Sequence, residues 1–223
     1  VPFGVIVSSF LLHAVLQSHF SKEFESQPEL LEKLLTSIYV DDVLSGAEDM
    51  TSALCFREMV EGALAKIGMK LHGWNSNSEE LRKLWGVVER EVVPVLGLLW
   101  DPVEDTLSVN VARVLESVDC NPTKKNLLSL TASVFDPLGY LQPFLVLPKL
   151  MFQQICKSKV GWRGSLPSDM QERWDSWKQQ LSALTQMHMP RQVTIPEYDR
   201  IELHCFADAS EVAYAACCYI KCV

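Results

Sequence analysis

Basic residues are scarce in this sequence, which holds 20 lysines and arginines against 28 aspartates and glutamates. The formal charge of −8 and the isoelectric point of about 5.2 argue against a free-standing nucleic-acid-binding protein, since such proteins usually carry a basic excess. Any contact with nucleic acid must therefore use a local patch. Two candidate patches are Lys124-Lys125 and the group Lys157, Lys159 and Arg163, and each could equally be a solvated face.

Several catalytic signatures are also missing. The sequence has no phosphate-binding glycine loop and no nucleophile elbow. The Asp-Thr/Ser-Gly triplet of aspartic peptidases is absent, and the nearest approaches to it are Asp105-Thr106-Leu107 and Asp208-Ala209-Ser210. These absences exclude nucleotide-binding proteins with a phosphate-binding glycine loop, hydrolases with a nucleophile elbow, and aspartic peptidases.

The seven cysteines form no regular framework. Cys217, Cys218 and Cys222 lack a second ligand pair at zinc spacing, so we expect no zinc site. The chain shows no signal peptide and no apolar run long enough to span a membrane, so we expect reduced thiols in a cytoplasmic or other intracellular setting, with no membrane partner. The first residue is Val1 rather than Met, which predicts that the chain is cut out of something longer.

Hydrophobic residues make up 48% of the chain, which is enough to bury a core in one large or two small domains. Hydrophobic periodicity predicts an α+β fold with a helical block after residue 120. The predicted helices begin near Ser8 and otherwise cover 28–35, 49–67, 77–88, 123–134, 143–158 and the segment from Ser168 to Pro190. The predicted strands cover 69–74, 93–100, 106–111, 201–206 and 213–223.

Local signals add detail to these helices. Ser168 and Gln171 predict a capping box, and Pro148 predicts a kink or a late helix start. Gly68 predicts the end of the helix that begins near residue 49. The face of that helix expected to be buried carries Met50, Leu54, Val60, Leu64 and Ile67. The core stripe expected in the last helix is Met170, Trp174, Trp177, Leu181 and Leu184.

The segment SIYVDDVLSG, residues 37–46, places two carboxylates side by side inside a strand-like run. On one interpretation, two four-residue strands meet at an Asp41-Asp42 turn, since Asp tolerates the positive φ of tight hairpins. On the other, adjacent carboxylates on a rigid turn hold a divalent cation, because like charges so close are costly unless a metal compensates them. The two interpretations are compatible, and the ten residues alone leave both open.

Six segments follow one another along the chain and carry a family resemblance. They are VPFGV and SSFLL near the start, YVDD at 39–42, GMKLHGWNSN at 68–77, VLGLLWDPVEDTL at 95–107, TKKNLLSLTASVFDPLGYLQP at 123–143 and LHCFADASEVAYAACCY at 203–219. In this order they resemble the reverse transcriptase of a BEL/Pao-type LTR retrotransposon. The resemblance implies a partial palm domain with a YxDD β-hairpin over 1–112, a helical thumb or connection block over 113–199, and the first strands of a truncated RNase H-like domain over 200–223.

The resemblance also assigns roles to individual residues. Asp41 would be the principal catalytic metal ligand, Asp42 its neighbour, and Asp208 the first RNase H carboxylate. Nucleic acid would contact Tyr39 and Val40 at the primer-side floor and Gly97 and Trp100 in the hairpin that resembles the primer grip. The implied chemistry is two-metal nucleotidyl transfer with Mg²⁺ or Mn²⁺, bound weakly in this fragment. The implied partners of the full-length protein are an RNA or DNA template-primer and deoxynucleoside triphosphates.

Some positions depart from the family pattern. The first palm aspartate, the fingers and the remaining RNase H carboxylates would lie outside residues 1–223. Ser9 stands where proline is usual, and Gly73 stands where a basic residue is usual. We therefore expect this chain to be inactive by itself. The alternative is a decayed or co-opted copy that has no enzymatic role and acts, if at all, as a binding module.

Overall fold

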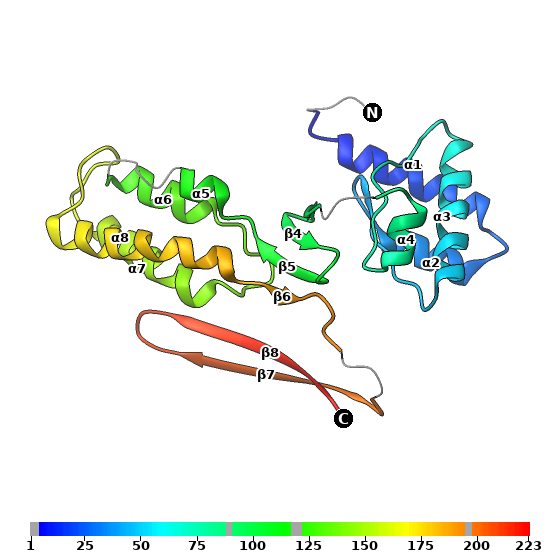
Figure 1. Ribbon diagram of the computed structural model, residues 1–223. Coiled ribbons are helices and arrows are strands. Elements are labelled where there is room, and N and C mark those ends of the chain that lie inside the picture. Colours follow the sequence, from blue (N-terminus) through cyan, green and yellow to red (C-terminus); the bar gives the residue numbers. More distant parts are fainter. Residues whose placement is uncertain (1–4, 88–90, 117–121, 195–197) are drawn as a thin grey trace. The chain divides into compact units, whose positions relative to one another are not determined.

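The computed structural model describes residues 5–87, 91–116, 122–194 and 198–223, and Figure 1 shows its helices and strands. The mixture of helices and short antiparallel sheets confirms the predicted α+β class. The chain forms two compact units, Val1–Asn75 and Ser76–Val223. The domain limits at 112 and 199, which follow the family resemblance, stay a prediction.

Within its described residues, 5–75, the first unit is built from three helices. They are α1 (Ser8–Glu23), α2 (Pro28–Ser37) and α3 (Met50–Ala65). The first begins at Ser8 as predicted, and Pro28 occupies the first turn of the second, where its missing N–H costs no helix hydrogen bond. The helices share one apolar core, whose buried members are Leu16, Phe20, Phe24, Leu34, Phe56, Val60, Ala63 and Leu64.

Helix α3 matches its predicted limits closely, and Val60, Leu64 and Ile67 of its predicted face belong to the core or pack against it. The side chain of Asp49 caps the first turn, and Gly68 ends the helical segment at φ +70°, a conformation that favours glycine. Val60 is buried as predicted, whereas Met50 is exposed and Phe56 enters the core. Phe56 lies four residues before Val60 and so shares its face.

The prediction of a strand over 69–74 is wrong. This segment has no regular secondary structure, and Gly73 sits at φ +71°, which interrupts extended backbone. Met69 and Leu71 pack against the core of the first unit without a strand partner. The alternation of apolar and polar residues over 69–74 therefore reflects the packing of Met69 and Leu71 against the core from an irregular segment.

The second unit contains a four-stranded antiparallel sheet in the order β3-β4-β5-β6. The strands are β3 (Val93–Val95), β4 (Leu98–Asp101), β5 (Thr106–Val109) and β6 (Met189–Pro190). The prediction of one strand over 93–100 is wrong, because Leu96 and Gly97 both take positive φ and form a tight hairpin turn. The segment DPVED, residues 101–105, predicts a hairpin between the strands at 93–100 and 106–111, and β4 and β5 confirm it, with Asp101 paired as the last residue of β4.

Several helices also belong to this unit. They are α4 (Glu79–Leu84), α5 (Ala112–Glu116), α6 (Lys124–Ser133), α7 (Gln142–Lys157), α8 (Ser168–Gln180) and the 3₁₀ helix η1 (Leu181–Gln186). Thr123 caps α6 by accepting the N–H of Asn126 at 3.2 Å. Helix α4 ends at Leu84, two residues before Gly86 at φ +73°, and residue 88 of the longer predicted helix lies outside the described residues.

The stripe predicted for the last helix lies in the core, as expected. Trp174 and Leu181 are fully buried, and Trp177 is almost so. Helix α7 runs through the buried Pro148, so the late start considered for this helix is wrong. The buried members of this core are Leu98, Val109, Val111, Val114, Leu127, Leu130, Val134, Leu141, Leu145, Met151, Ile155, Leu166, Trp174, Trp177, Leu181 and Leu184.

Two predicted helix limits are wrong. Ser168 does not cap α8, because Pro167 is the N-cap residue and the Gln171 amide donates to the carbonyl oxygen of Leu166 at 2.6 Å. Pro190 does not end the helix, which stops at Gln180, before η1. Pro190 lies instead in β6 at the edge of the sheet, where a missing N–H is tolerated.

The two predicted C-terminal strands are confirmed as β7 (Ile201–Ala209) and β8 (Tyr214–Cys222). They pair with each other along all nine residues and form a separate two-stranded sheet (Figure 1). Large apolar side chains are exposed on this hairpin, including Leu203 at 68% and Tyr214 at 89%. Two-stranded ribbons of this kind are marginally stable in water without further cover.

Candidate functional site

The YVDD segment forms a very short hairpin in the first unit. Strand β1 (Ile38–Tyr39) pairs with β2 (Asp42–Val43), and Tyr39 lies opposite Asp42. The turn residues are therefore Val40 and Asp41, not Asp41 and Asp42, and the predicted four-residue strands are two residues long. Asp42 belongs to the second strand, directly after the turn.

Val40 supplies the unusual backbone conformation of this turn. Its φ is +54°, which is strained for a β-branched residue. The hairpin is held by the core beneath it, because Ile38 and Val43 pack against the buried residues of the first unit. The N–H of Leu44 also donates to the carbonyl oxygen of Ser37 at 2.7 Å. Such strain persists only where the surrounding structure enforces it.

The exposed end of the hairpin carries the predicted site residues. Tyr39, Val40, Asp41 and Asp42 are all exposed. Partial burial raises the pKa of Asp42 above its ordinary value, and the neighbouring charge of Asp41 raises it further. The turn therefore holds two carboxylates whose joint ionisation is unfavourable, and a bound cation would relieve that repulsion.

Asp208 lies in the second unit, one residue before the end of β7. It is exposed, pairs across the hairpin with Ala215, and accepts the N–H of Ala209 on Oδ1 at 2.8 Å. Among the described residues, no group of three or more His, Cys, Asp or Glu side chains is close enough together to hold a metal ion. Asp208 and the pair Asp41-Asp42 belong to different compact units.

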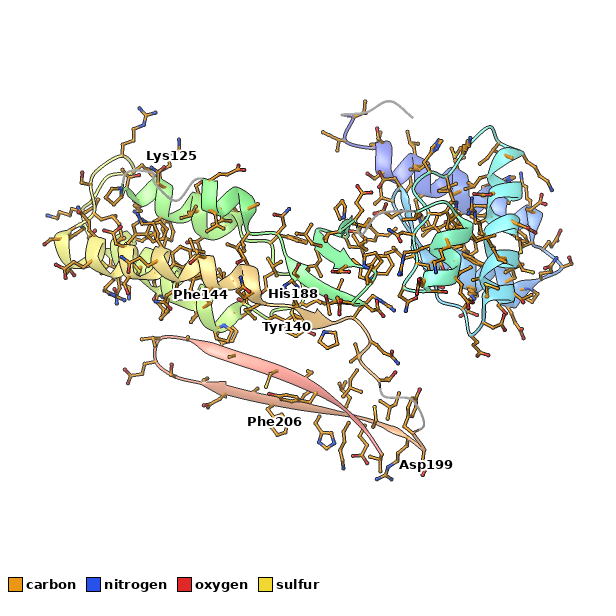
Figure 2. The ribbon with its side chains drawn as sticks, viewed as in Figure 1. Lys125, Tyr140, Phe144, His188, Asp199 and Phe206 are labelled. Atoms are coloured by element: carbon orange, nitrogen blue, oxygen red, sulfur yellow. The ribbon has the colours of Figure 1, made fainter. Side chains whose placement is uncertain are left out.

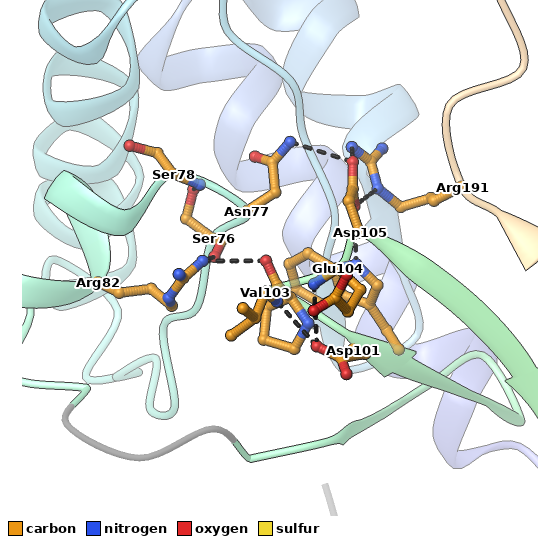
Figure 3. A network of polar contacts seen from close by, with 11 residues as sticks. Ser76, Asn77, Ser78, Arg82, Asp101, Val103, Glu104, Asp105 and Arg191 are labelled. Carbon is orange, nitrogen blue, oxygen red and sulfur yellow. Dashed lines mark hydrogen bonds and ion pairs between the residues drawn. The ribbon is translucent and has the colours of Figure 1, made fainter. Parts of the chain in front are cut away.

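Trp100 takes part in a polar network that sequence analysis missed (Figure 3). Its indole Nε1–H donates to Oδ1 of Asp105 at 2.9 Å. Arg191 binds the same carboxylate with Nε at 2.6 Å and Nη2 at 2.7 Å, and its guanidinium lies 6.0 Å from the Trp100 ring centroid. Asn77 donates to Oδ2 at 3.2 Å. Trp100 is therefore held by contacts within the protein and is partly exposed.

The charge at the centre of this network is stabilised by its neighbours. Hydrogen bonding from Arg191, supported by Trp100 and Asn77, holds the pKa of Asp105 below its usual range. Arg82 extends the network by donating from Nη1 to the carbonyl oxygens of Ser76 at 2.8 Å and Pro102 at 2.9 Å (Figure 3). No local signal could reveal the Asp105–Arg191 pair, because its members lie 86 residues apart in the sequence.

Gly97, the other predicted contact for nucleic acid, lies against an aromatic ring. A Cβ at this position would come within 2.3 Å of Cε1 of Phe135. Its φ of +85° is also one that residues with side chains avoid. The hairpin turn thus needs glycine for both backbone conformation and packing.

These features can be compared with known proteins. Residues 123–223 match the family described as the Pao retrotransposon-like RNaseH-like domain. The match supports a Pao-type retrotransposon element as the origin of this region, which runs from α6 to the C-terminal hairpin. No curated protein and no solved structure matches the chain. No helix within the described ranges is long and apolar enough to cross a membrane.

The match confirms the Pao-type part of the predicted resemblance and the RNase H-like character of the C-terminal region. It begins at residue 123, at the N-cap of α6, whereas the strands expected from RNase H begin at residue 200. The reverse transcriptase palm and the YxDD assignment lie before the matched residues and stay predictions.

Proposed function

We propose that the chain is a fragment of a BEL/Pao retrotransposon polyprotein, from the part that carries RNA-directed DNA polymerase and RNase H. The observation that carries this proposal is the Asp41-Asp42 pair at the strained Val40-Asp41 turn and the first residue after it, in the same chain as a region that matches a Pao retrotransposon domain. A turn supported by a packed core presents carboxylates more rigidly than a loop.

The hairpin residues have distinct roles in this proposal. Ile38 and Val43 fix the hairpin on the core, and Asp41 and Asp42 supply hard oxygen ligands. A bound Mg²⁺ or Mn²⁺ would activate the attacking primer hydroxyl and neutralise the leaving oxygen in the full-length protein. Tyr39 and Val40, both exposed beside the carboxylates, form the surface offered to the primer. Gly97 and Trp100 are the proposed contacts for nucleic acid in the second unit.

Two carboxylates alone make a weak metal site. We expect a dissociation constant for Mg²⁺ in the millimolar range or weaker, which corresponds to about −4 kcal/mol. Because repulsion from Asp41 contributes to the raised pKa of Asp42, metal and protons should compete for this site. Asp208 is proposed as the first carboxylate of a separate RNase H site.

The test is a Mn²⁺ titration followed by amide NMR. We expect paramagnetic broadening to begin at residues 39–43 and to disappear in the Asp41→Asn/Asp42→Asn variant. The exposed pair Glu79 and Glu80 at the start of α4 serves as the internal control. Broadening centred only on Glu79 and Glu80, or broadening unchanged in the double variant, would refute the metal site.

The alternative function is that of a decayed or co-opted copy that binds partners without catalysis. The net charge of −8 favours it, since a polymerase fragment must attract a polyanion. Sequencing the flanking DNA separates the two proposals. A reading frame that continues on both sides supports a polyprotein fragment, whereas a stop or splice boundary near both ends supports the relic.

A further inference from the structure

One end of the helical block concentrates positive charge in an otherwise acidic chain. Segments 122–126 and 157–170 together carry five basic residues and one acidic residue, Asp169. The basic residues are Lys124, Lys125, Lys157, Lys159 and Arg163. We name this set, together with Trp162 and Phe152, the basic-aromatic end.

Backbone contacts bring the two segments together. The N–H of Lys125 donates to the carbonyl oxygen of Trp162 at 3.1 Å, and the N–H of Leu166 donates to the carbonyl oxygen of Pro122 at 2.9 Å. A β-bridge also joins Thr123 to Ser165. The loop between α7 and α8 is therefore fastened to the first turn of α6, and Figure 2 shows Lys125 at this end of the block. The N-terminus of α6 adds its own partial positive charge.

Aromatic rings lie among these charges. The Lys124 ammonium group lies 5.2 Å from the ring centroid of Trp162 and 6.0 Å from that of Phe152. The two rings are 6.2 Å apart at 40°. Trp162 is 55% exposed, although tryptophan side chains are mostly buried on average. Lys124 and Phe152 thus contact an indole ring that remains more than half exposed.

The basic side chains around Trp162 are also available. Lys125, Lys157, Lys159 and Arg163 are exposed, and none of them forms an ion pair or side-chain hydrogen bond with the residues that the structure describes. Exposed carboxylates elsewhere in the chain do find basic partners, as Glu79 does with Lys83 and Asp175 with Lys178. The basic-aromatic end therefore suits an anionic ligand that carries a flat group.

We propose that the basic-aromatic end binds single-stranded nucleic acid, with the phosphates on Lys125, Lys159 and Arg163 and a base stacked on Trp162. Lysine and arginine side chains recognise phosphate by charge, whereas an open indole face accepts any base. This combination favours a single strand over a duplex, whose bases are already stacked. The surface belongs to the second unit, whereas Asp41 and Asp42 belong to the first, and the proposal holds whether or not they bind metal.

The test measures binding of a fluorescein-labelled oligothymidylate of about 20 nucleotides by anisotropy, in EDTA, at several salt concentrations. The triple variant Lys125→Gln/Lys159→Gln/Arg163→Gln removes three proposed phosphate contacts. We expect it to bind at least tenfold more weakly and to reduce the slope of log affinity against log salt by about 2. The matched control is Lys22→Gln/Lys70→Gln/Lys149→Gln, which changes the net charge equally at exposed positions and should keep the wild-type slope.

Trp162 is tested separately because its role is stacking. Trp162→Ala should weaken binding by about tenfold, and Trp162→Phe should keep most of the affinity, since it retains a ring. Oligothymidylate should quench the tryptophan emission of the wild-type protein but not that of Trp162→Phe. Quenching that persists in Trp162→Phe would refute the stacking contact.

Other outcomes distinguish this proposal from its rivals. Equal loss of affinity in the two triple variants would refute it, because that result reflects net charge alone. Displacement of the oligonucleotide by polyglutamate at equal charge concentration would also refute it and would indicate a surface for acidic polypeptides. The Asp41→Asn/Asp42→Asn variant should bind normally in EDTA, so failure of the proposed metal site leaves this result unaffected.

Discussion

The indole Nε1–H of Trp177 donates to the carbonyl oxygen of Phe144 at 3.2 Å, and the two rings stack at 5.0 Å. In a regular helix, this carbonyl would accept the N–H of the residue four positions later, which is Pro148 and has none. Trp177 of α8 therefore satisfies the acceptor that the proline leaves open in α7. The relationship explains how α7 continues through a buried proline.

This relationship predicts coupling between residues 148 and 177. Trp177→Phe should lower the free energy of unfolding by about 2 kcal/mol, through lost packing and an unpaired carbonyl. Part of this loss should return in Pro148→Ala/Trp177→Phe, because alanine in place of the proline supplies the missing N–H. Urea unfolding of both single variants and the double variant gives the coupling energy. The exposed Trp162→Phe is the control, and a strictly additive cycle would contradict the account.

A second prediction concerns the Leu96-Gly97 turn. Gly97→Ala should destabilise the second unit by at least about 2 kcal/mol, because of its positive φ and the Phe135 ring that a Cβ would meet. Gly161→Ala, where no atom lies within 4 Å of the added Cβ, should change stability by less than about 0.5 kcal/mol. Thermal unfolding compares the two variants. Equal stability would mean that the turn relaxes without cost.

A third prediction concerns pH. The pKa of Asp105 is lower in the folded protein than in the unfolded chain, so the unfolded chain takes up the proton more readily as pH falls. Stability from the Arg191 pair is therefore complete above the unfolded-state pKa of Asp105 and disappears as pH falls through the folded-state pKa. Arg191→Gln should cost about 1 kcal/mol at pH 7 and almost nothing below the folded-state pKa.

Urea unfolding of the wild type and Arg191→Gln from pH 7 to pH 2 measures this dependence. Lys83→Gln is the control, because it breaks only the exposed pair with Glu79 and should change the free energy of unfolding less than Arg191→Gln does. A difference between wild type and Arg191→Gln that stays constant with pH would show that the arginine acts by packing on Trp100.

A fourth prediction concerns catalysis. The chain alone should show no polymerase activity, because two carboxylates on one turn lack the third ligand of a palm site. Primer extension on a primed RNA template with Mg²⁺ should give no product above an Asp41→Asn control. Clear extension that Asp41→Asn abolishes would contradict this expectation and would mean that another side chain completes the site.

A fifth prediction concerns the C-terminal hairpin. Exposed Leu203, Phe206 and Tyr214 lie on strands that pair only with each other in the described part of the chain, and such strands recruit other chains. Deleting residues 200–223 should raise soluble yield under reducing conditions and leave the far-ultraviolet helix signal intact. A lower yield or a weaker helix signal would place the hairpin in the core of the second unit.

Sequence reasoning succeeded where the signal was local and periodic. The Trp174 and Trp177 stripe and the two C-terminal strands follow from residue spacing, and both are present. Boundaries were less predictable. The N-cap of α8 is Pro167 and not the predicted Ser168, and the Gln171 side chain donates to the carbonyl oxygen of Leu166. The residues at 93–100 favour a strand, although the structure has a turn at Leu96-Gly97.

The candidate site was only partly predictable. YVDD indicated a hairpin with Asp41 and Asp42 in the turn, but the observed strand pairing places Val40 and Asp41 there. This register depends on the packing of Ile38 and Val43 against the core, which the segment alone does not reveal. The Asp105–Arg191 pair and the Trp177–Phe144 hydrogen bond join residues that only the folded chain brings together.

The pairing of β6 with β5 also orders events in folding. Met189 lies opposite Leu107, so the intervening helices must close a long loop before this edge of the sheet can form. The entropy of loop closure makes such contacts late, whereas the β3-β4-β5 meander closes through short turns. Arg191, which binds Asp105 at the same edge, is therefore recruited only after α5 to η1 have collapsed. We therefore expect the ion pair to form late in folding and to stabilise a nearly complete fold.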